Sequence, residues 1–220
     1  FDMVISEDVG LYKYDILAQR ALGKIKDALA IIKENKPQEI LPDIHHVKPL
    51  LLDENINKMI SQADCIGCFC VESPAMRSLL KKLEVNNYLG LVAASSIIRP
   101  GVSKSGMMRE YILRHKNPER RKQAHPVMRE LMEDTYGVMV YQEDVIKVAH
   151  HFAGLDLGEA DVLRRGMSGK FRSRKEFQRV ENKFIANCRE KGYEDQLTFE
   201  VWKQVESFAG YAFAKGHSAS

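Results

Sequence analysis

A segment between Asp161 and Lys170 carries the residues best suited to binding a phosphorylated ligand. Arg164 and Arg165 are adjacent, and a turn rich in glycine and serine separates them from Lys170. Guanidinium groups form paired hydrogen bonds with phosphate oxygens, and an ammonium group adds a point charge, so this segment could clamp a triphosphate. It is not a Walker loop, because only two residues separate its glycines and Phe171 stands where that loop needs serine or threonine.

A second candidate site is the stretch from Phe208 to Ser218, which mixes aromatic and polar residues. It contains Lys215 and His217 beside several aromatic rings. Such rings can form a floor on which a base or a sugar stacks, while the cation, the imidazole and the hydroxyl contact phosphate. A helix-to-loop turn with packed aromatic residues would produce the same pattern.

A third candidate is the cysteine cluster Cys65, Cys68 and Cys70. The spacing CxxCxC could begin a zinc or iron–sulfur site if a fourth ligand folded beside it. The segment 65–72 also alternates small apolar and aromatic residues, which favours a strand with buried, unreactive thiols. Cys188 has no neighbour at ligand spacing, and four cysteines in 220 residues are too few for a secreted disulfide scaffold, which favours a cytoplasmic protein.

Positive charge is concentrated in two segments, although the formal net charge of the chain is only +3. Residues 99–129 contain nine Lys or Arg and two acidic residues, and residues 163–175 contain six Lys or Arg and no acidic residue. These segments carry +7 and +6, and the rest of the chain carries −10. Segregated basic surface favours polyanion binding, since each phosphate neutralised releases counterions. The alternative is that these residues form solvated helix faces.

The elements that must position these residues are mostly helices. Strands are predicted at 10–16 and 65–72, with a helix at 17–35 between them and a short helix capped by Asp53. Apolar periodicity then predicts helices at 75–84, 87–96, 105–115, 125–134, 140–152, 158–166, 174–191 and 198–208. Ser173 and Glu176 predict a capping box for the helix at 174–191, and Gly192 predicts its end.

The composition favours a globular protein without a membrane span. Hydrophobic residues make up 45% of the chain, which excludes a disordered or collagen-like polymer. No apolar run approaches the roughly 20 residues of a membrane helix, and we expect no signal peptide. The chain begins at Phe1 rather than Met, so we expect a segment cut from a longer protein.

Six motifs occur in order along the chain: Val9–Leu17, Cys68–Ser73, Ile98–Gly101, Thr135–Glu143, Ala160–Met167 and Phe208–Ser218. Together they resemble the C-family bacterial replicative DNA polymerases, the alpha subunits of DNA polymerase III, over nearly the whole chain. The chain departs from the family pattern at Cys70, Ala214 and Gly216, where Gln, Asn and Ser are usual. These departures are typical of a divergent member, either a main replicase or an error-prone paralogue.

The resemblance implies a mainly α fold with a small β part, in which residues 1–35 end a nucleotidyltransferase-like palm, 36–72 form a connector with a short strand, and 73–220 form helical fingers. The family palm holds two Mg²⁺ ions with three carboxylates, and Asp15 matches the third of them. An acidic side chain between Tyr14 and Ile16, on an otherwise apolar strand, suits a metal ligand. Asp15 is therefore expected to be both the catalytic and the metal-binding residue of this chain.

The implied function is Mg²⁺-dependent nucleotidyl transfer from a dNTP to a primer 3′ hydroxyl, as part of a DNA-directed DNA polymerase. The residues expected around the nucleotide are Arg164, Arg165, Lys170, Arg99, Lys215, His217 and Ser218. Contacts to the backbone of primer–template DNA, which are independent of sequence, are expected from Lys104, Arg109, Arg114, Lys116, Arg120, Arg121 and Lys122. Other replicase subunits and the sliding clamp would bind regions outside this chain.

The upstream Asp-x-Asp pair of the family does not occur in these 220 residues. We therefore expect the chain by itself to be inactive and to bind no Mg²⁺ tightly. The alternatives from other classes are a non-catalytic helical module that binds nucleic acid or a partner and carries a metal site at the cysteine cluster, and a structural interaction domain with evenly scattered basic residues.

Overall fold

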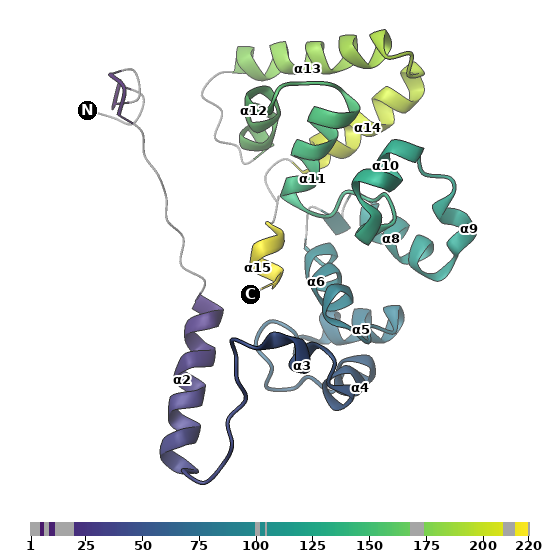
Figure 1. Ribbon diagram of the computed structural model, residues 1–220. Helices are drawn as coiled ribbons and strands as arrows, with labels where there is room; N and C mark the ends of the chain where they lie inside the picture. The colour runs from purple at the N-terminus through teal and green to yellow at the C-terminus, as the bar shows by residue number, and fades with distance from the viewer. Residues whose placement is uncertain are drawn as a thin grey trace. The chain divides into compact units, whose positions relative to one another are not determined.

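The computed structural model describes residues 5–6, 9–11, 20–99, 102–103, 105–167, 174–208 and 214–219. The chain divides into two compact units, Phe1–Asp43 with Ser220, and Ile44–Ala219. Every regular element that these residues form is helical, and Figure 1 labels most of them along the chain. The mainly α fold is confirmed, whereas the small β part and the palm piece are not, because the described ranges contain no strand.

The first unit contains helix α2, Arg20–Asn35, so the helix predicted at 17–35 is confirmed over its described part. Several apolar positions of α2 remain exposed: Leu22, Ile25, Ile31 and Ile32. The strand predicted at 10–16 lies outside the described residues, except for Leu11 and for Gly10, which lies in a turn.

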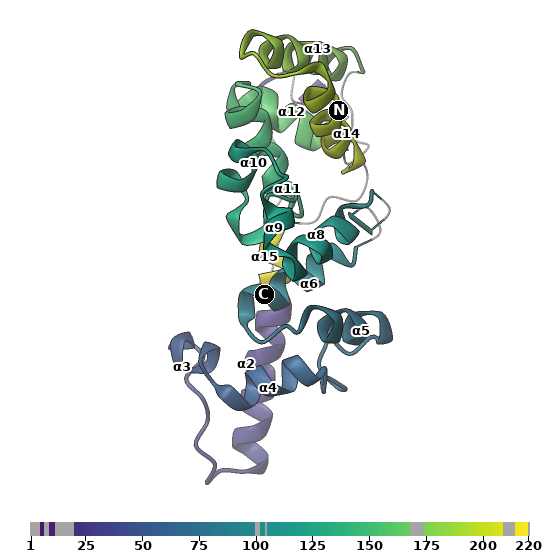
Figure 2. The same cartoon turned by 90° about the vertical axis from the view of Figure 1, so that its right-hand side faces the viewer.

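The second unit begins with helices that are defined by their caps. Asp53 Oδ1 accepts hydrogen bonds from the backbone of Asn55 at 2.8 Å and of Ile56 at 3.2 Å, which confirms it as an N-cap. The four helices of this part are α3 (Val47–Leu51), α4 (Glu54–Gln62), α5 (Pro74–Leu83) and α6 (Tyr88–Ile97). Helix α5 packs against α4, α6 and α8, Met107–Lys116 (Figure 2).

The strand predicted at 65–72 is wrong, because the chain forms turns there. Gly67 and Cys70 have φ values of 86° and 67°, in the left-handed region that a strand does not use. The backbone N–H of Val71 donates to the carbonyl of Cys68 at 3.1 Å, which is a local turn bond. The alternation of residue types was therefore misleading, since no neighbouring strand among the described residues offers a ladder of hydrogen bonds.

The middle of the second unit consists of short helices. The helix predicted at 125–134 is divided into α10 and a 3₁₀ turn, and the one predicted at 140–152 changes to a π-helical turn after Lys147. Tyr136 and Gly137 both have positive φ, which separates these two regions. The elements are α9 (Pro118–Arg121), α10 (Pro126–Leu131), the 3₁₀ turn η1 (Glu133–Thr135), α11 (Gln142–Lys147) and the π-helical turn η2 (Val148–Phe152).

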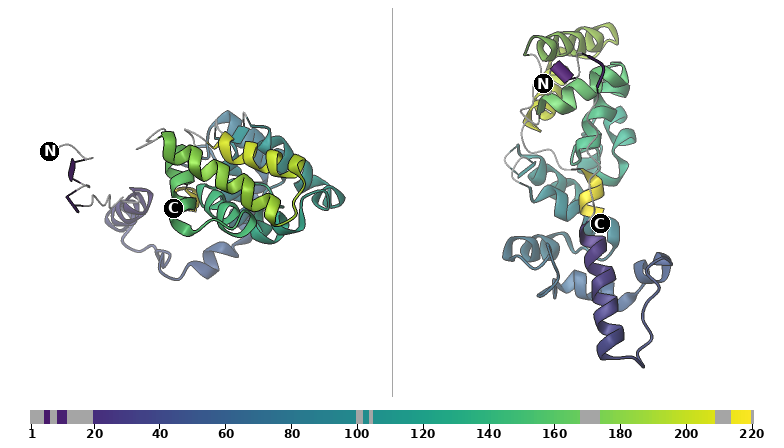
Figure 3. Two further views of the ribbon diagram at one scale, coloured as in Figure 1. Left: turned by 90° about the horizontal axis from the view of Figure 1, so that it is seen from above. Right: turned by 90° about the vertical axis from the view of Figure 1, so that its left-hand side faces the viewer.

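The largest aromatic cluster of the core lies between η2 and the last long helices. The Phe152 ring stacks on Tyr193 at 4.3 Å, and Phe184 contacts Trp202 at 5.2 Å between ring centroids. Helices α13 and α14 pack side by side over this cluster (Figure 3). Gly192, with φ 79°, follows α13 as predicted, and Ser173 lies outside the described residues. The remaining helices are α12 (Leu157–Met167), α13 (Arg174–Glu190), α14 (Asp195–Ser207) and α15 (Lys215–Ala219).

Truncation of the core aromatic Phe184 should strongly destabilise the second unit. We expect Phe184→Ala to lower the free energy of unfolding by about 3–5 kcal/mol, because the ring is fully buried and its removal leaves a cavity. Phe199→Ala, on the exposed face of α14, is the matched control and should lower it by less than about 1 kcal/mol. Urea unfolding followed by circular dichroism measures both, and equal losses would contradict this description of the core.

Candidate functional site

Helix α15 carries three of the predicted nucleotide-binding residues and packs against α6. The hydroxyl oxygens of Ser218 and Ser96 lie 2.7 Å apart. Ser96 Oγ also lies 2.8 Å from the carbonyl oxygen of Val92, and when it donates its hydrogen there, Ser218 is the donor to Ser96. Tyr88 also donates its phenol hydrogen to the carbonyl of Ala219 at 2.7 Å. Two hydrogen bonds, one between Ser218 and Ser96 and one from Tyr88 to Ala219, therefore attach α15 to α6.

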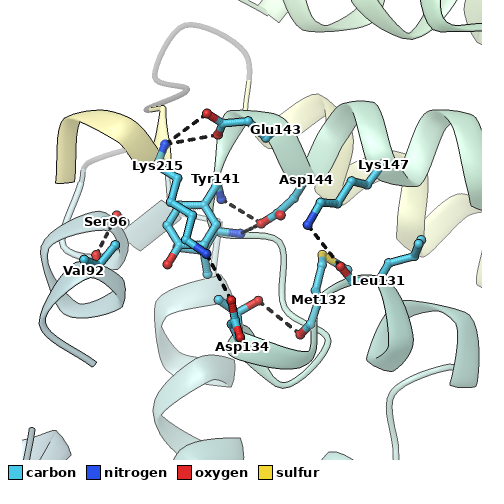
Figure 4. Close-up of polar contacts among 12 residues, drawn as sticks. Val92, Ser96, Leu131, Met132, Asp134, Tyr141, Glu143, Asp144, Lys147 and Lys215 are labelled. Carbon is cyan, nitrogen blue, oxygen red and sulfur yellow. Dashed lines mark hydrogen bonds and ion pairs between the residues drawn. The ribbon is translucent and has the colours of Figure 1, made fainter. Parts of the chain in front are cut away.

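Lys215, the first residue of α15, is held at both its backbone and its side chain (Figure 4). Its N–H donates to the two carboxylate oxygens of Glu143 at 3.2 and 3.1 Å. Its ammonium group lies 3.0 Å from Asp134 Oδ2 and 5.1 Å from the centre of the Tyr141 ring. Glu143 and Asp134 thus position a cation that the sequence analysis assigned to the nucleotide.

A cavity of about 160 Å³ lies beside Lys215. Five of the residues that line it are acidic: Glu130, Glu133, Asp134, Glu143 and Asp144. Negative charge repels phosphate, so a triphosphate that binds Lys215 must approach from outside this cavity.

Asp144 explains the position of Tyr141 and Glu143. Its Oδ2 accepts hydrogen bonds from the backbone N–H groups of Val140 and Tyr141, both at 2.9 Å, and so caps α11 from the third helical position, as in a capping box. Burial raises the pKa of the Asp144 carboxyl, and the two backbone hydrogen bonds oppose that shift. These hydrogen bonds fix where α11 begins. Glu143, in the first turn of α11, therefore faces the start of α15.

Arg164 and Arg165 share one carboxylate on α12. Asp161 Oδ1 lies 2.6 Å from Arg164 Nη2, and its Oδ2 lies 2.9 Å from Arg165 Nε. All three side chains are partly or largely exposed, so the pair of cations remains accessible to solvent. Helix α12 packs against α11, so α11 contacts both groups of candidate nucleotide-binding residues.

Several basic residues of the segment 99–129 make internal contacts. Arg114 and Arg120 both bind Glu110, at 2.8 and 2.9 Å. Arg121 donates to the carbonyl groups of Arg114 and His115 at 2.7 and 3.0 Å, and therefore joins α9 to the end of α8. These three arginines fold the segment, whatever else they contact.

Other residues of this segment face solvent. Arg109 and Lys116 are exposed, and in the part of the chain that the structure describes they make no hydrogen bond or ion pair through their side chains. Lys122 is exposed and pairs with Glu119 at 2.7 Å. Among the described residues of this segment, Arg109, Lys116 and Arg129 are thus exposed basic side chains that a polyanion could contact.

Two of the remaining predicted residues are described by the structure, and three are not. Arg99 is half-buried after α6, and His217 is exposed on α15. Asp15, Lys104 and Lys170 lie outside the described residues. Sequence reasoning missed Asp134, Glu143 and Ser96 as partners of α15; only Glu143 had a signal, since it ends the motif Thr135–Glu143.

The described residues contain no group of three or more His, Cys, Asp or Glu that could hold a metal ion. The cysteine cluster therefore offers no metal centre within them. The prediction of buried thiols is confirmed for Cys65 and Cys188 but is wrong for Cys68 and Cys70, which are exposed because they lie in turns. The described helices also include none that is long and apolar enough to cross a membrane.

Comparison with known proteins gives one consistent result. Residues 21–192 match the family model described as the bacterial DNA polymerase III alpha subunit finger domain. The chain is 34% identical over 220 residues to DNA polymerase III subunit alpha of Aquifex aeolicus (strain VF5), covering 100% of this chain and 18% of that protein. It is 34% identical over 218 residues to the subunit of Staphylococcus aureus (strain COL), covering 99% of this chain and 20% of that protein. The chain thus spans about a fifth of the length of the curated relatives it matches.

The ion pairs of Glu110 should make stability depend on pH. Hydrogen bonding from Arg120, together with Arg114, lowers the pKa of Glu110 below its ordinary value. The resulting stabilisation is complete above the ordinary carboxyl pKa of about 4.3 and is lost as the pH falls through the lowered value. We expect Glu110→Gln to be less stable than the wild type at pH 7 and to lose less stability on acidification, as measured by urea unfolding. The exposed Glu190→Gln is the control, and an equal change in both variants would contradict this role of Glu110.

Proposed function

The chain belongs to the finger-domain family of the bacterial DNA polymerase III alpha subunit. From this premise, we propose that it binds the incoming nucleotide and the DNA backbone as part of a replicative DNA polymerase. The observation that carries this proposal is the place of α11. Its packing partner α12 bears Arg164 and Arg165, and its own Glu143 holds Lys215. One short helix thus contacts both α12, which bears the paired arginines, and the start of α15.

We propose that the triphosphate binds these cations by exchanging partners with them. Without a ligand, Asp161 neutralises Arg164 and Arg165, and Asp134 neutralises Lys215. A triphosphate offers more negative charge and more acceptor oxygens than one carboxylate, and arginine can bind it through two parallel hydrogen bonds. The carboxylates keep the cations oriented until the nucleotide arrives. Lys170, Arg99, His217 and Ser218 complete the proposed set, and the Ser218 hydroxyl would have to leave Ser96 to donate its hydrogen to phosphate.

The DNA backbone is proposed to lie along the segment that begins after α6. Arg109 and Lys116 supply accessible charges, Lys122 is a further exposed cation, and Lys104, outside the described residues, remains part of the proposal. Arg114, Arg120 and Arg121 belong to the same proposed surface, and their internal hydrogen bonds give it a fixed shape. Contacts to phosphates carry no sequence information, which suits a protein that must copy any template.

Catalysis by the whole polymerase is proposed to follow the family, with nucleotidyl transfer to a primer 3′ hydroxyl in the presence of two Mg²⁺ ions. The described residues do not fit a metal site, so no step of transfer is assigned to them. Asp15 remains the proposed catalytic and metal-binding residue. Other replicase subunits and the sliding clamp are proposed to bind the longer polypeptide outside this chain.

The chain by itself should not extend a primer. One candidate carboxylate cannot replace the three that the family resemblance requires, and the sequence contains no Asp-x-Asp. A primer-extension assay with the purified 220-residue chain, Mg²⁺ and all four dNTPs should show no product. Template-directed synthesis would contradict the proposed division of the catalytic residues.

Binding of primer–template DNA should weaken steeply with salt. We expect log K to fall linearly with log salt concentration, because bound phosphates release their counterions. Arg109→Ala and Lys116→Ala should each reduce the size of the slope by about one, as expected for the loss of one phosphate contact. Lys58→Ala on α4 is the control and should leave the slope unchanged. Fluorescence anisotropy measures all four proteins, and a salt-independent affinity would contradict the DNA surface.

Nucleotide binding should depend on the paired arginines of α12. We expect Arg164→Ala and Arg165→Ala each to weaken binding of a fluorescent dNTP by about tenfold or more, since a hydrogen bond to a charged group contributes about 1.5–3 kcal/mol. Arg189→Ala is a matched control, because Arg189 is also exposed and also pairs with an aspartate, Asp195, at 2.8 Å. Equal affinities for all three variants would argue against the nucleotide clamp, while DNA binding could remain intact.

A further inference from the structure

The cysteine cluster lies in two consecutive β-turns that share Cys68. The N–H of Cys68 donates to the carbonyl of Cys65 at 3.1 Å, and Gly67, at the third position of that turn, has φ 86°. This combination is typical of a type II turn. The second turn closes from Val71 to Cys68 at 3.1 Å, with Cys70 at the position of positive φ.

The first turn brings two cysteines within reach of each other. The end residues of a β-turn have Cα atoms less than about 7 Å apart, and a disulfide needs about 4.4–6.8 Å. Burial raises the pKa of the Cys65 thiol, and the negative charge of the Cys68 thiolate raises it further.

The two thiols differ in exposure. Cys68 is exposed, whereas only 5% of Cys65 is accessible. All four cysteines of the chain are free thiols. An exposed thiol can meet a reagent from solution, and a buried thiol beside it can react only with its neighbour. Cys68 would therefore react first, with a reagent from solution, and Cys65 would then react with Cys68.

We propose that Cys65 and Cys68 form a redox-active dithiol, which a low-molecular-weight disulfide such as oxidised glutathione converts into an intramolecular disulfide. This proposal does not rest on the proposed nucleotide and DNA surfaces. Cys65 lies outside the six motifs that carry the family resemblance, and Cys68 begins one of them.

The reaction proceeds by two thiol–disulfide exchanges. The Cys68 thiolate attacks one sulfur of oxidised glutathione, forms a mixed disulfide and releases one glutathione thiolate, which takes up a proton. Cys65 then loses its proton to solvent, and its thiolate attacks the Cys68 sulfur and releases the second glutathione. The protein loses two electrons and two protons in total, and one glutathione disulfide becomes two thiols.

The disulfide would close the turn from Cys65 to Cys68 within the connection between α4 and α5. Ala63 ends α4 and accepts a hydrogen bond at 3.0 Å from Arg77 on α5, and Ser73 caps α5. A covalent bond in this connection reduces the freedom of the unfolded chain, so oxidation should raise the melting temperature. Reduction by dithiothreitol should restore the original value.

The test is oxidation of the reduced 220-residue chain by oxidised glutathione, followed by alkylation of free thiols and intact mass spectrometry. We expect a product that has lost two hydrogens and carries no glutathione, with Cys70 still alkylated and Cys188 alkylated after unfolding. Cys188 is fully buried, and burial raises its pKa to about 11, so it serves as the unreactive internal reference. A product that stops at the glutathione adduct would overturn the proposal.

Trypsin leaves Cys65, Cys68 and Cys70 in one peptide, so a digest cannot show which two cysteines form the disulfide. Substitutions identify them. Cys68→Ser, at an exposed position, should abolish the disulfide, and Cys65→Ala should accumulate the mixed disulfide on Cys68. Cys70→Ser and Cys188→Ser are the controls and should form the disulfide as fast as the wild type. A disulfide that persists in Cys68→Ser, or that is lost in Cys70→Ser, would overturn the assignment. Circular dichroism checks that each variant is folded, and Cys68→Ser decides the result even if Cys65→Ala does not fold.

Discussion

The capping of α11 by the buried carboxylate of Asp144 is the interaction on which the candidate site depends. Its two backbone hydrogen bonds end the extended segment that leads to Tyr141 and begin the helix there. Glu143 follows in the first turn and holds the backbone of Lys215. Helix α11 also packs against α12, which carries the paired arginines. A buried polar group is stable only with its hydrogen-bond partners, so this cap permits little variation in the geometry around it.

Charge serves two purposes in this chain, and the structure separates them. Arg114, Arg120 and Arg121 are as basic as Arg109 and Lys116, yet they bind Glu110 and backbone carbonyl groups inside the unit. Arginine suits both purposes, because its planar guanidinium group makes several hydrogen bonds in fixed directions. A count of basic residues therefore overstates the surface that is open to phosphate.

Helices were predictable because each carries its own periodicity and caps, as Asp53 and Gly192 illustrate. The segment 65–72 was mispredicted because a strand, unlike a helix, needs hydrogen bonds from a neighbouring strand. Alternation of residue types therefore indicates a strand only where such a neighbour can pair with it. Residue types also identified Arg164, Arg165 and Lys215 as candidate ligands of phosphate. The carboxylate partners of Lys215 could not be predicted, because Asp134 and Glu143 lie more than seventy positions from it in the sequence.

The sequence by itself determined the helical class, the family resemblance and the types of residue available for binding phosphate, because these depend on local pattern and side-chain chemistry. Tertiary structure decided which cations face solvent, which carboxylates hold them and which cysteines are exposed. Those properties depend on packing between distant segments, such as the contact of Ser218 with Ser96 and of Lys215 with Asp134. Local propensity carries no information about such contacts, since burial and hydrogen bonding across the fold determine their free energy.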